Sequence, residues 1–410
     1  FLRDLKVKMR TNTITTLLVA LGLSAPALAV ELKPGSVMTK DGAEITPTLQ
    51  LGVSSNDNFF MTPSATQSRL IWNIAPSLNA LIEDGPDSYK FDIASSTSFH
   101  NKDTTDNFTQ VNLGAGVHKE FTSQHRLDVT GDADWLYEPR GAGLTEGQPN
   151  VINELIHYQQ QNLTARYEYG AKSSKAQVAL TAGYYNKNYQ NFTAISQYRD
   201  YDKPMLGIIG YYNTQAGTRA FLEIKQENYQ YDVIDSNGIS RDSDDVKVLL
   251  GMEWEATAVT TGSFKVGYQN KDFESNLRDN FSGLSWEAAA VWKPLTYSTL
   301  QLVTSRAAKD PLLEGDYIRE SVYGATWQHD WSDFLSSVVS ANYVDQQYSG
   351  SFNRKDKVKN ARLGLNYLAT NFGMVTGYVD FIDRNSTQTN IEFDRVIVGL
   401  NFTFALKGNE

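Results

Sequence analysis

The segment Asp394–Phe404 reads Asp-Arg-Val-Ile-Val-Gly-Leu-Asn-Phe-Thr-Phe, and its apolar residues recur at every second position. The apolar face of this extended chain consists of Val396, Val398, Leu400, Phe402 and Phe404. The opposite face is mixed and includes Asn401 and Thr403. Such alternation predicts a β-strand with one side against an apolar medium. That medium is either the interior of a β-sandwich or the lipid around a transmembrane β-barrel.

The same two-residue alternation recurs along the whole chain. The further segments are 44–56, 67–82, 88–100, 106–119, 125–138, 154–169, 175–188, 204–213, 218–230, 245–256, 262–272, 282–293, 297–306, 317–330, 334–347, 357–368 and 373–383. Together with a last strand over 393–405, the sequence predicts about eighteen strands. An even strand number is typical of single-chain bacterial barrels.

The connections between these segments alternate in length. Those after even-numbered segments are short: 83–87, 121–124, 170–174, 213–217, 293–296, 330–333 and 369–372. Those after odd-numbered segments are generally longer and more polar, as in 139–153, 189–203, 231–244, 273–281 and 307–316. Short periplasmic turns and long external loops are the pattern of a transmembrane barrel, whereas a sandwich has Greek-key crossovers. We therefore predict an all-β fold, an up-and-down antiparallel barrel in the outer membrane of a Gram-negative bacterium.

Aromatic residues gather near the ends of the predicted strands. The predicted girdle comprises Trp135, Tyr137, Tyr167, Tyr212, Trp254, Trp292, Trp327 and Tyr367. Tyr158 and Tyr184 lie toward the long loops, and we expect them in the same belt. Trp and Tyr at both interfaces are the mark of a barrel in lipid, while ordinary core aromatics lie mid-strand.

The start of the chain predicts export. Residues 1–8 precede Met9 and look like an upstream extension, and 9–29 has the basic start, short apolar run and Ala27-Leu28-Ala29 site of a signal peptide. We expect a short periplasmic segment over 30–43, a single barrel over 44–405 and a tail over 406–410. The apolar run is too short for a membrane helix.

Composition excludes several classes of function. The chain has no cysteine, which removes thiol chemistry and cysteine metal sites. Its formal net charge of −10 argues against a nucleic-acid partner. After the predicted signal peptide, no apolar run approaches the ~20 residues of a membrane helix.

Motifs for catalysis or metal binding are missing from the sequence. The histidines are His100, His118, His125, His157 and His329, and no His-x-x-x-His pair or Gly-x-Ser-x-Gly elbow occurs. A serine and a histidine could still meet across strands. The acidic stretch 232–245 could bind divalent cations, but it lacks calcium-loop spacing, so a solvated loop is the simpler interpretation. We predict no enzyme activity and no cofactor.

Polar residues opposite the apolar faces are the better candidates for function. If the apolar faces meet lipid, these residues line the lumen: Glu223, Lys225, Glu227, Lys247, Glu253, Glu255, Lys265, Gln269, Glu287, Arg362, Asn366 and Arg395. Both signs of charge occur, so no single-sign filter is predicted. They could equally fill and solvate a wide lumen without a specific role.

Two stretches resemble the putative beta-barrel porin 2 family, whose genes often accompany those for exopolysaccharide or capsule synthesis. They are Leu51-Gly-Val-Ser-Ser-Asn-Asp-Asn-Phe-Phe60 with Leu70-Ile-Trp-Asn-Ile-Ala-Pro-Ser-Leu78, and Val291-Trp-Lys-Pro-Leu-Thr-Tyr-Ser-Thr-Leu-Gln-Leu302. The last strand also resembles the C-terminal signal of outer-membrane barrels, although Ala-Leu-Lys-Gly-Asn-Glu follows it. The resemblance implies an eighteen-stranded barrel whose last strand pairs with its first.

The resemblance further implies a channel for a secreted exopolysaccharide or capsular polysaccharide. The expected partners are outer-membrane lipids and lipopolysaccharide, the barrel assembly machinery, the polysaccharide and periplasmic export components. Two alternatives stay open: a general or oligosaccharide-uptake porin, and a barrel hydrolase or structural, adhesive surface protein.

Overall fold

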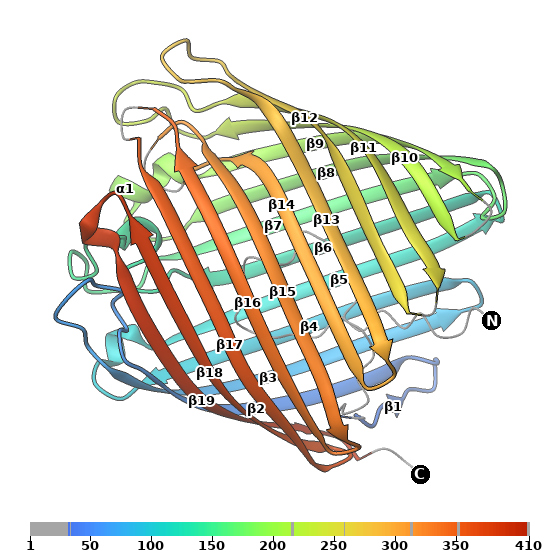
Figure 1. Ribbon diagram of the computed structural model, residues 1–410, viewed down its shortest axis with the longest axis horizontal. Coiled ribbons are helices and arrows are strands. Elements are labelled where there is room, and N and C mark those ends of the chain that lie inside the picture. The colour runs from blue at the N-terminus through green and yellow to red at the C-terminus, as the bar shows by residue number, and fades with distance from the viewer. Residues whose placement is uncertain are drawn as a thin grey trace.

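The computed structural model describes residue 32 and residues 34–214, 217–257, 259–311, 315–350 and 353–407, without the side chains of 256 and 257. The predicted extension 1–8, the predicted signal peptide 9–29 and residues 408–410 of the predicted tail lie outside this range. The described chain is one closed barrel of eighteen antiparallel strands (Figure 1), which confirms the predicted fold class.

The barrel strands are regular and long, each paired with its neighbours in the sequence. They are β2 (Glu44–Asn56), β3 (Arg69–Asp84), β4 (Asp87–His100), β5 (Phe108–Thr122), β6 (His125–Tyr137), β7 (His157–Tyr169), β8 (Ala176–Tyr189), β9 (Tyr201–Asn213), β10 (Thr218–Tyr231), β11 (Ser243–Thr257), β12 (Thr260–Phe273), β13 (Phe281–Leu295), β14 (Ser298–Lys309), β15 (Ile318–Ser332), β16 (Leu335–Tyr348), β17 (Lys355–Thr370), β18 (Gly373–Ser386) and β19 (Phe393–Ala405).

The last strand closes the barrel against the first, because lipid leaves no tolerance for an open sheet edge. The register sets Leu400 opposite Val53, Phe402 opposite Leu51 and Phe404 opposite Leu49. Directly opposed residues of an antiparallel pair point to the same face, so the apolar faces of both strands merge. The predicted closure is confirmed.

Turn length follows the predicted alternation. β3 and β4 are separated by residues 85–86 only, whereas 138–156 connects β6 to β7. The longer loops hold the helix α1 (Thr193–Ser196) and the short 3-10 turns η1 (Thr104–Asp106), η2 (Gly143–Thr145), η3 (Gln197–Arg199) and η4 (Thr389–Ile391). The sequence does not predict β1 (Val37–Met38), which pairs with the start of β2.

The outer face of the barrel is apolar. Large side chains that would be buried in a soluble sandwich are exposed here, among them Leu206 at 67%, Leu250 at 63% and Leu365 at 56%. Among the described residues, no helix is long and apolar enough to cross a membrane. Because apolar side chains are exposed around the outside of a closed barrel, this band faces lipid, and the alternate positions of every strand face the inside of the barrel.

Candidate functional site

The inner face of the barrel carries the polar residues that the sequence singles out. The register pairs Lys225 with Lys247, Lys247 with Gln269 and Lys265 with Glu287, so their side chains share one face across β10–β13. They alternate with exposed apolar residues such as Leu222 and Ile224. The same parity places all twelve predicted lumen residues on the inner face, with Arg362 and Asn366 on β17 and Arg395 on β19.

Ion pairs join the inner faces of β9 to β13. Glu227 receives three lysine ammonium groups, at 3.1 Å from Lys203, 3.2 Å from Lys225 and 3.4 Å from Lys247. Lys265 bridges Glu223 at 3.0 Å and Glu287 at 3.1 Å. Four lysines and three glutamates alternate here, so their charges largely cancel. This wall offers many local hydrogen-bonding groups and no field of one sign.

Tyrosines and lysines gather on the inner wall toward the long loops. Tyr201 lies between Tyr185, at 5.6 Å between ring centroids, and Tyr229, at 5.8 Å. The ammonium group of Lys203 lies 5.1 Å from the centroid of the Tyr229 ring, a cation–π distance. Sequence reasoning missed this cluster because its tyrosines belong to three strands, β8, β9 and β10.

The structure corrects the placement of Tyr158. Its position on β7 has the parity of Gln160 and Asn162, whereas Leu163 on the other parity is 54% exposed. Its ring lies 5.4 Å from that of Tyr189, with the Lys187 ammonium group 4.2 Å from the Tyr158 centroid. Tyr158 therefore faces inward and cannot belong to the girdle. Tyr184 does lie on the outer face and is 45% exposed.

The predicted girdle residues lie near the ends of their strands. Those with the apolar outward parity and the largest exposure are Tyr212, Trp292, Trp327, Tyr367 and Trp135. Tyr167 and Trp254 are less exposed on the same parity. Tyr137, at the long-loop end of β6, stacks on Phe108 with 5.4 Å between centroids.

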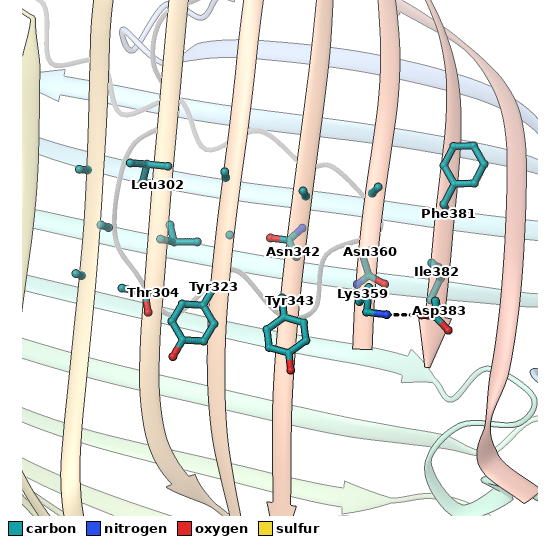
Figure 2. A pocket seen from close by; sticks show the side chains of 18 of the residues that line it. Leu302, Thr304, Tyr323, Asn342, Tyr343, Lys359, Asn360, Phe381, Ile382 and Asp383 are labelled. Carbon is teal, nitrogen blue, oxygen red and sulfur yellow. Dashed lines mark hydrogen bonds and ion pairs between the residues drawn. The ribbon is translucent and has the colours of Figure 1, made fainter. Parts of the chain in front are cut away.

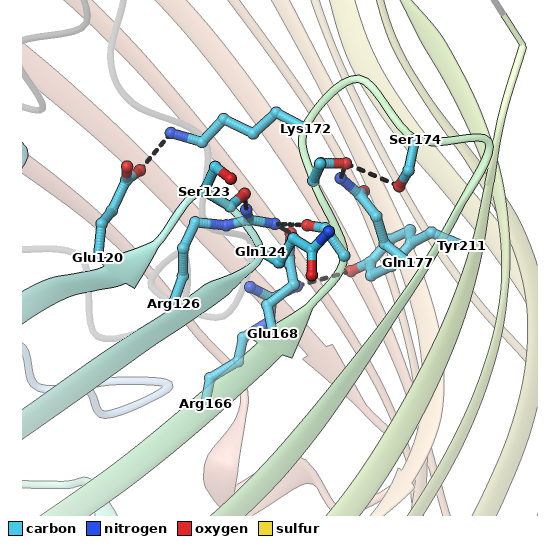
Figure 3. A network of polar contacts seen from close by, with 12 residues as sticks. Glu120, Ser123, Gln124, Arg126, Arg166, Glu168, Lys172, Ser174, Gln177 and Tyr211 are labelled. Carbon is cyan, nitrogen blue, oxygen red and sulfur yellow. Dashed lines mark hydrogen bonds and ion pairs between the residues drawn. The ribbon is translucent and has the colours of Figure 1, made fainter.

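A second polar network holds the inner wall at the short-turn end (Figure 3). Glu168 accepts hydrogen bonds from Arg126 and, at 2.7 Å, from Arg166. Arg166 also donates to the Tyr211 hydroxyl at 3.2 Å, and Lys172 pairs with Glu120. These contacts tie β5–β9 together at this rim, where β-strand pairing ends.

Some side chains on the inner face of the barrel are buried and do not contact solvent. The side chain of Gln269 is fully buried and bonds the main chain of β14, accepting from Ala308 N at 2.8 Å and donating to Ala308 O at 3.0 Å. Ser285 likewise donates to Arg306 O at 2.8 Å. The β13–β14 pairing ends at Trp286–Arg306, so these side chains satisfy main-chain groups of β14 that lack a strand partner. Gln269 therefore faces protein rather than an aqueous lumen.

The loop 138–156 crosses the long-loop mouth of the barrel. It leaves between β6 and β7, yet the Glu146 carboxylate pairs with Arg354 at 2.7 Å and with Arg384 at 2.6 Å, close to β17 and on β18. In the ring of strands these lie nearly opposite β6 and β7. The loop therefore spans the opening and narrows it.

The anchor of this loop is a buried cluster of charges. Arg354 is 1% exposed and binds Asp356 as well as Glu146, and Arg384 binds Asp356 at 2.7 Å. Burial alone would lower the pKa of Arg354, but its hydrogen bonds to Asp356 and Glu146 raise the pKa above its ordinary value. Gly147 follows with φ +71°, and a side chain there would meet Asn390 at 2.5 Å. The glycine allows the loop to approach the far wall.

Asp200, at the end of the loop that follows β8, gives a pH-dependent prediction. Burial raises the pKa of Asp200 to about 6, although its carboxylate accepts a hydrogen bond from Tyr189 N. Because the pKa of this carboxyl group is higher in the folded protein than in the unfolded chain, protonation stabilises the fold. This stabilisation is fully present below the pKa of the unfolded chain and is lost as the pH rises through about 6. The stability of the wild type relative to Asp200→Asn should fall by about 1 kcal/mol between pH 4 and 7. Urea unfolding in detergent micelles at both pH values measures it, and a pH-independent difference would contradict it.

The acidic stretch 232–245 and the histidines, which the sequence offered as candidates for metal binding or catalysis, make contacts with other protein groups. In the acidic stretch 232–245, Asp235 pairs with Arg278 at 2.5 Å and Asp245 accepts from Gln269 at 2.7 Å. His118 bonds Asp128 at 2.6 Å, and His125 bonds Tyr167. Within the described ranges, no group of three or more His, Cys, Asp or Glu side chains could hold a metal ion.

Comparison with known proteins agrees with this architecture. The family model described as "Putative beta-barrel porin 2" matches residues 44–406. No curated protein matches the chain.

Three solved structures illustrate the structural likeness. OpdK from Pseudomonas aeruginosa with vanillate has 10% identity and TM-score 0.49, covering 88% of this chain and 98% of that one. OccAB4 from Acinetobacter baumannii has 15% identity and TM-score 0.47, covering 88% and 97%. The FrpB iron transporter from Neisseria meningitidis has 9% identity and TM-score 0.46, and the match covers 87% of this chain but only 66% of FrpB.

Proposed function

This chain belongs to the putative beta-barrel porin 2 family, and on that premise we propose that it passes a secreted exopolysaccharide or capsular polysaccharide. The protein is an outer-membrane β-barrel porin, and an eighteen-stranded barrel leaves an aqueous lumen where loops do not occupy it. The polymer as cargo is supported by the family resemblance and by the chemistry of the inner wall. We also propose that the protein is not an enzyme.

The inner wall suits a sliding carbohydrate chain. A polymer that moves needs many weak contacts and no deep site, since a tight site would hold it. The alternating charges around Glu227 and Lys265 supply hydrogen-bonding groups whose charges cancel. We propose that eleven of the predicted lumen residues, all but Gln269, line the path, and that residues 44–405 form the single transport unit.

The crossing loop favours a second candidate. A loop anchored across the mouth by Glu146 and Arg354 narrows the opening, which suits a small solute better than a thick polymer. An oligosaccharide-uptake porin is therefore the main alternative. Barrel assembly machinery is a proposed partner under either account, and periplasmic export components are proposed partners for export alone.

Deleting the gene tests the proposal directly. We expect surface polysaccharide to disappear from the deletion strain while its synthesis enzymes stay active and the polymer accumulates inside the cell. Complementation with the intact gene should restore it. Normal surface polymer in the deletion strain would refute export and leave uptake as the better account.

Single changes on the inner wall should have small effects. Each partly exposed ion pair contributes only ~0.2–1 kcal/mol, so Glu253→Gln or Lys265→Gln should change the rate of polymer release by no more than about fivefold. Radiolabelled polymer appearing outside the cell over time measures it. A complete loss of export from one such substitution would show a specific binding site instead.

A further inference from the structure

Outward-facing cations are concentrated on one part of the barrel wall. Among the described residues of β2–β19, six Lys or Arg share the parity of the exposed apolar side chains. Lys119 lies beside a short turn. The other five lie on β14, β15 and β17 toward the long loops and are named the basic patch: Arg306, Arg319, Lys355, Lys357 and Lys359.

The strand register arranges this patch in rows. Arg319, Gln347 and Lys355 lie opposite one another on β15, β16 and β17. With neighbouring strands ~4.8 Å apart, Arg319 and Lys355 stand about 10 Å from each other. Lys355 and Lys357 are exposed, and Lys359 pairs with Asp383 at 3.0 Å.

The patch retains a positive charge after its acidic neighbours are included. Asp345, Asp383 and Asp394 share its rows, and five cations minus three carboxylates leave +2. Elsewhere on the long-loop half of the outer wall, the described strands present carboxylates such as Asp202, Asp244 and Asp272 but no Lys or Arg. This charge is therefore local to one side of the barrel.

A trench about 930 Å³ in volume lies next to the basic patch, on its short-turn side (Figure 2). Its floor is one cross-strand row of mostly small side chains, Ala290, Leu302, Ala325, Ala341 and Ala361. The next row toward the short turns is bulky and includes Trp327, Val339 and Leu363. The adjacent outward row toward the long loops, with Tyr323, Tyr343 and Lys359, also lines the trench.

We propose that the basic patch and the trench together bind a phosphorylated saccharolipid of the outer leaflet. Its phosphates would meet Arg319, Lys355 and Lys357, and one of its acyl chains would lie along the alanine floor. The long loops mark the external side of the barrel, so the patch lies at the depth of the outer-leaflet head groups. This inference is independent of what passes through the lumen.

The geometry favours a head group with more than one phosphate. A phospholipid offers a single phosphate, which would engage one end of a patch whose cations are about 10 Å apart. A second copy of the chain would need a bulky, acidic surface to fit the same site. On the described outer wall, Asp244 and Asp272 lie opposite each other on β11 and β12, but two carboxylates do not match the five cations of the basic patch.

The test compares lipid retention by purified variants. Arg319→Gln, Lys355→Gln and Lys357→Gln are combined, and the matched control replaces Lys119, Lys172 and Lys175, three cations near short turns, by Gln. Native mass spectrometry counts the bound molecules after titration with core-truncated lipopolysaccharide. Each cation near an anionic lipid surface raises the binding affinity about fivefold. The patch variant, which lacks three of them, should therefore bind lipopolysaccharide about a hundredfold more weakly, while the affinity of the control is unchanged. Ala341→Trp, which fills the trench without altering charge, should also weaken binding.

Three results would overturn the proposal. The first is equal lipid retention by the patch variant and the control. The second and third concern the wild type: it binds phosphatase-treated lipopolysaccharide, or phosphatidylglycerol vesicles, as tightly as untreated lipopolysaccharide. A stable dimer or trimer that buries Ala341 in lipid-free detergent would assign the trench to a second copy instead. Heat-modifiable migration on gels confirms that each variant is folded.

Discussion

Replacing Leu250 with Arg is expected to destabilise the barrel by roughly 2–4 kcal/mol, because a charge near the bilayer midplane loses its hydration. Leu250 lies mid-strand on β11, has outward parity and is 63% exposed, so its side chain meets lipid rather than protein. Equilibrium unfolding in lipid vesicles measures the change. In cells, the same variant should assemble poorly.

The matched control puts the same charge on the inner face. Ser285 is unsuitable, because it is 1% exposed and bonds the main chain of β14. Thr130, mid-strand on β6, faces inward and is exposed, so Thr130→Arg should cost little. Equal destabilisation by both substitutions would mean that the assigned faces are wrong.

Shortening the loop 138–156 is expected to raise single-channel conductance severalfold, because this loop crosses the mouth. Removing residues 142–152 also removes Glu146, the carboxylate that pairs with Arg354 and Arg384. A milder variant, Glu146→Gln, keeps the loop but leaves the buried arginines short of one negative charge, which costs about 3–5 kcal/mol of local stability. It should give a flickering channel in planar bilayers.

The control for this experiment is the loop 232–242. Its Asp235 contacts Arg278 of the adjacent loop, so the contact stays on one side of the mouth. Shortening it should leave conductance nearly unchanged. Unchanged conductance after loss of 142–152 would show that the crossing loop does not limit the pore.

The strands were predictable because their signal is local. A period of two with one apolar face repeats over every strand, and the predicted bounds 44–56 and 393–405 coincide with β2 and β19. Closure followed from the exclusion of open edges in lipid. The lumen candidates followed from the same parity, since the opposite face of a lipid-exposed strand must face inward.

The features that restrict the lumen could not be predicted in this way. Glu146 and Arg354 are 208 positions apart, and neither lies in a pattern that points to the other. Tyr158 was misplaced because aromatics near a strand end fit either face. Gln269 has the correct parity, but its burial depends on where the pairing of β14 ends, which the sequence does not mark.

The most direct test of the account is a reversible block of the lumen in living cells. The chain has no cysteine, so a single Lys225→Cys on the inner wall can be labelled selectively with a bulky disulfide-forming reagent. Asn237→Cys, on an exposed external loop, is the control. The account predicts that labelling at 225 stops polymer from reaching the surface, that reductant restores it, and that labelling at 237 has no effect. Undiminished surface polymer with position 225 fully labelled would contradict passage through this barrel.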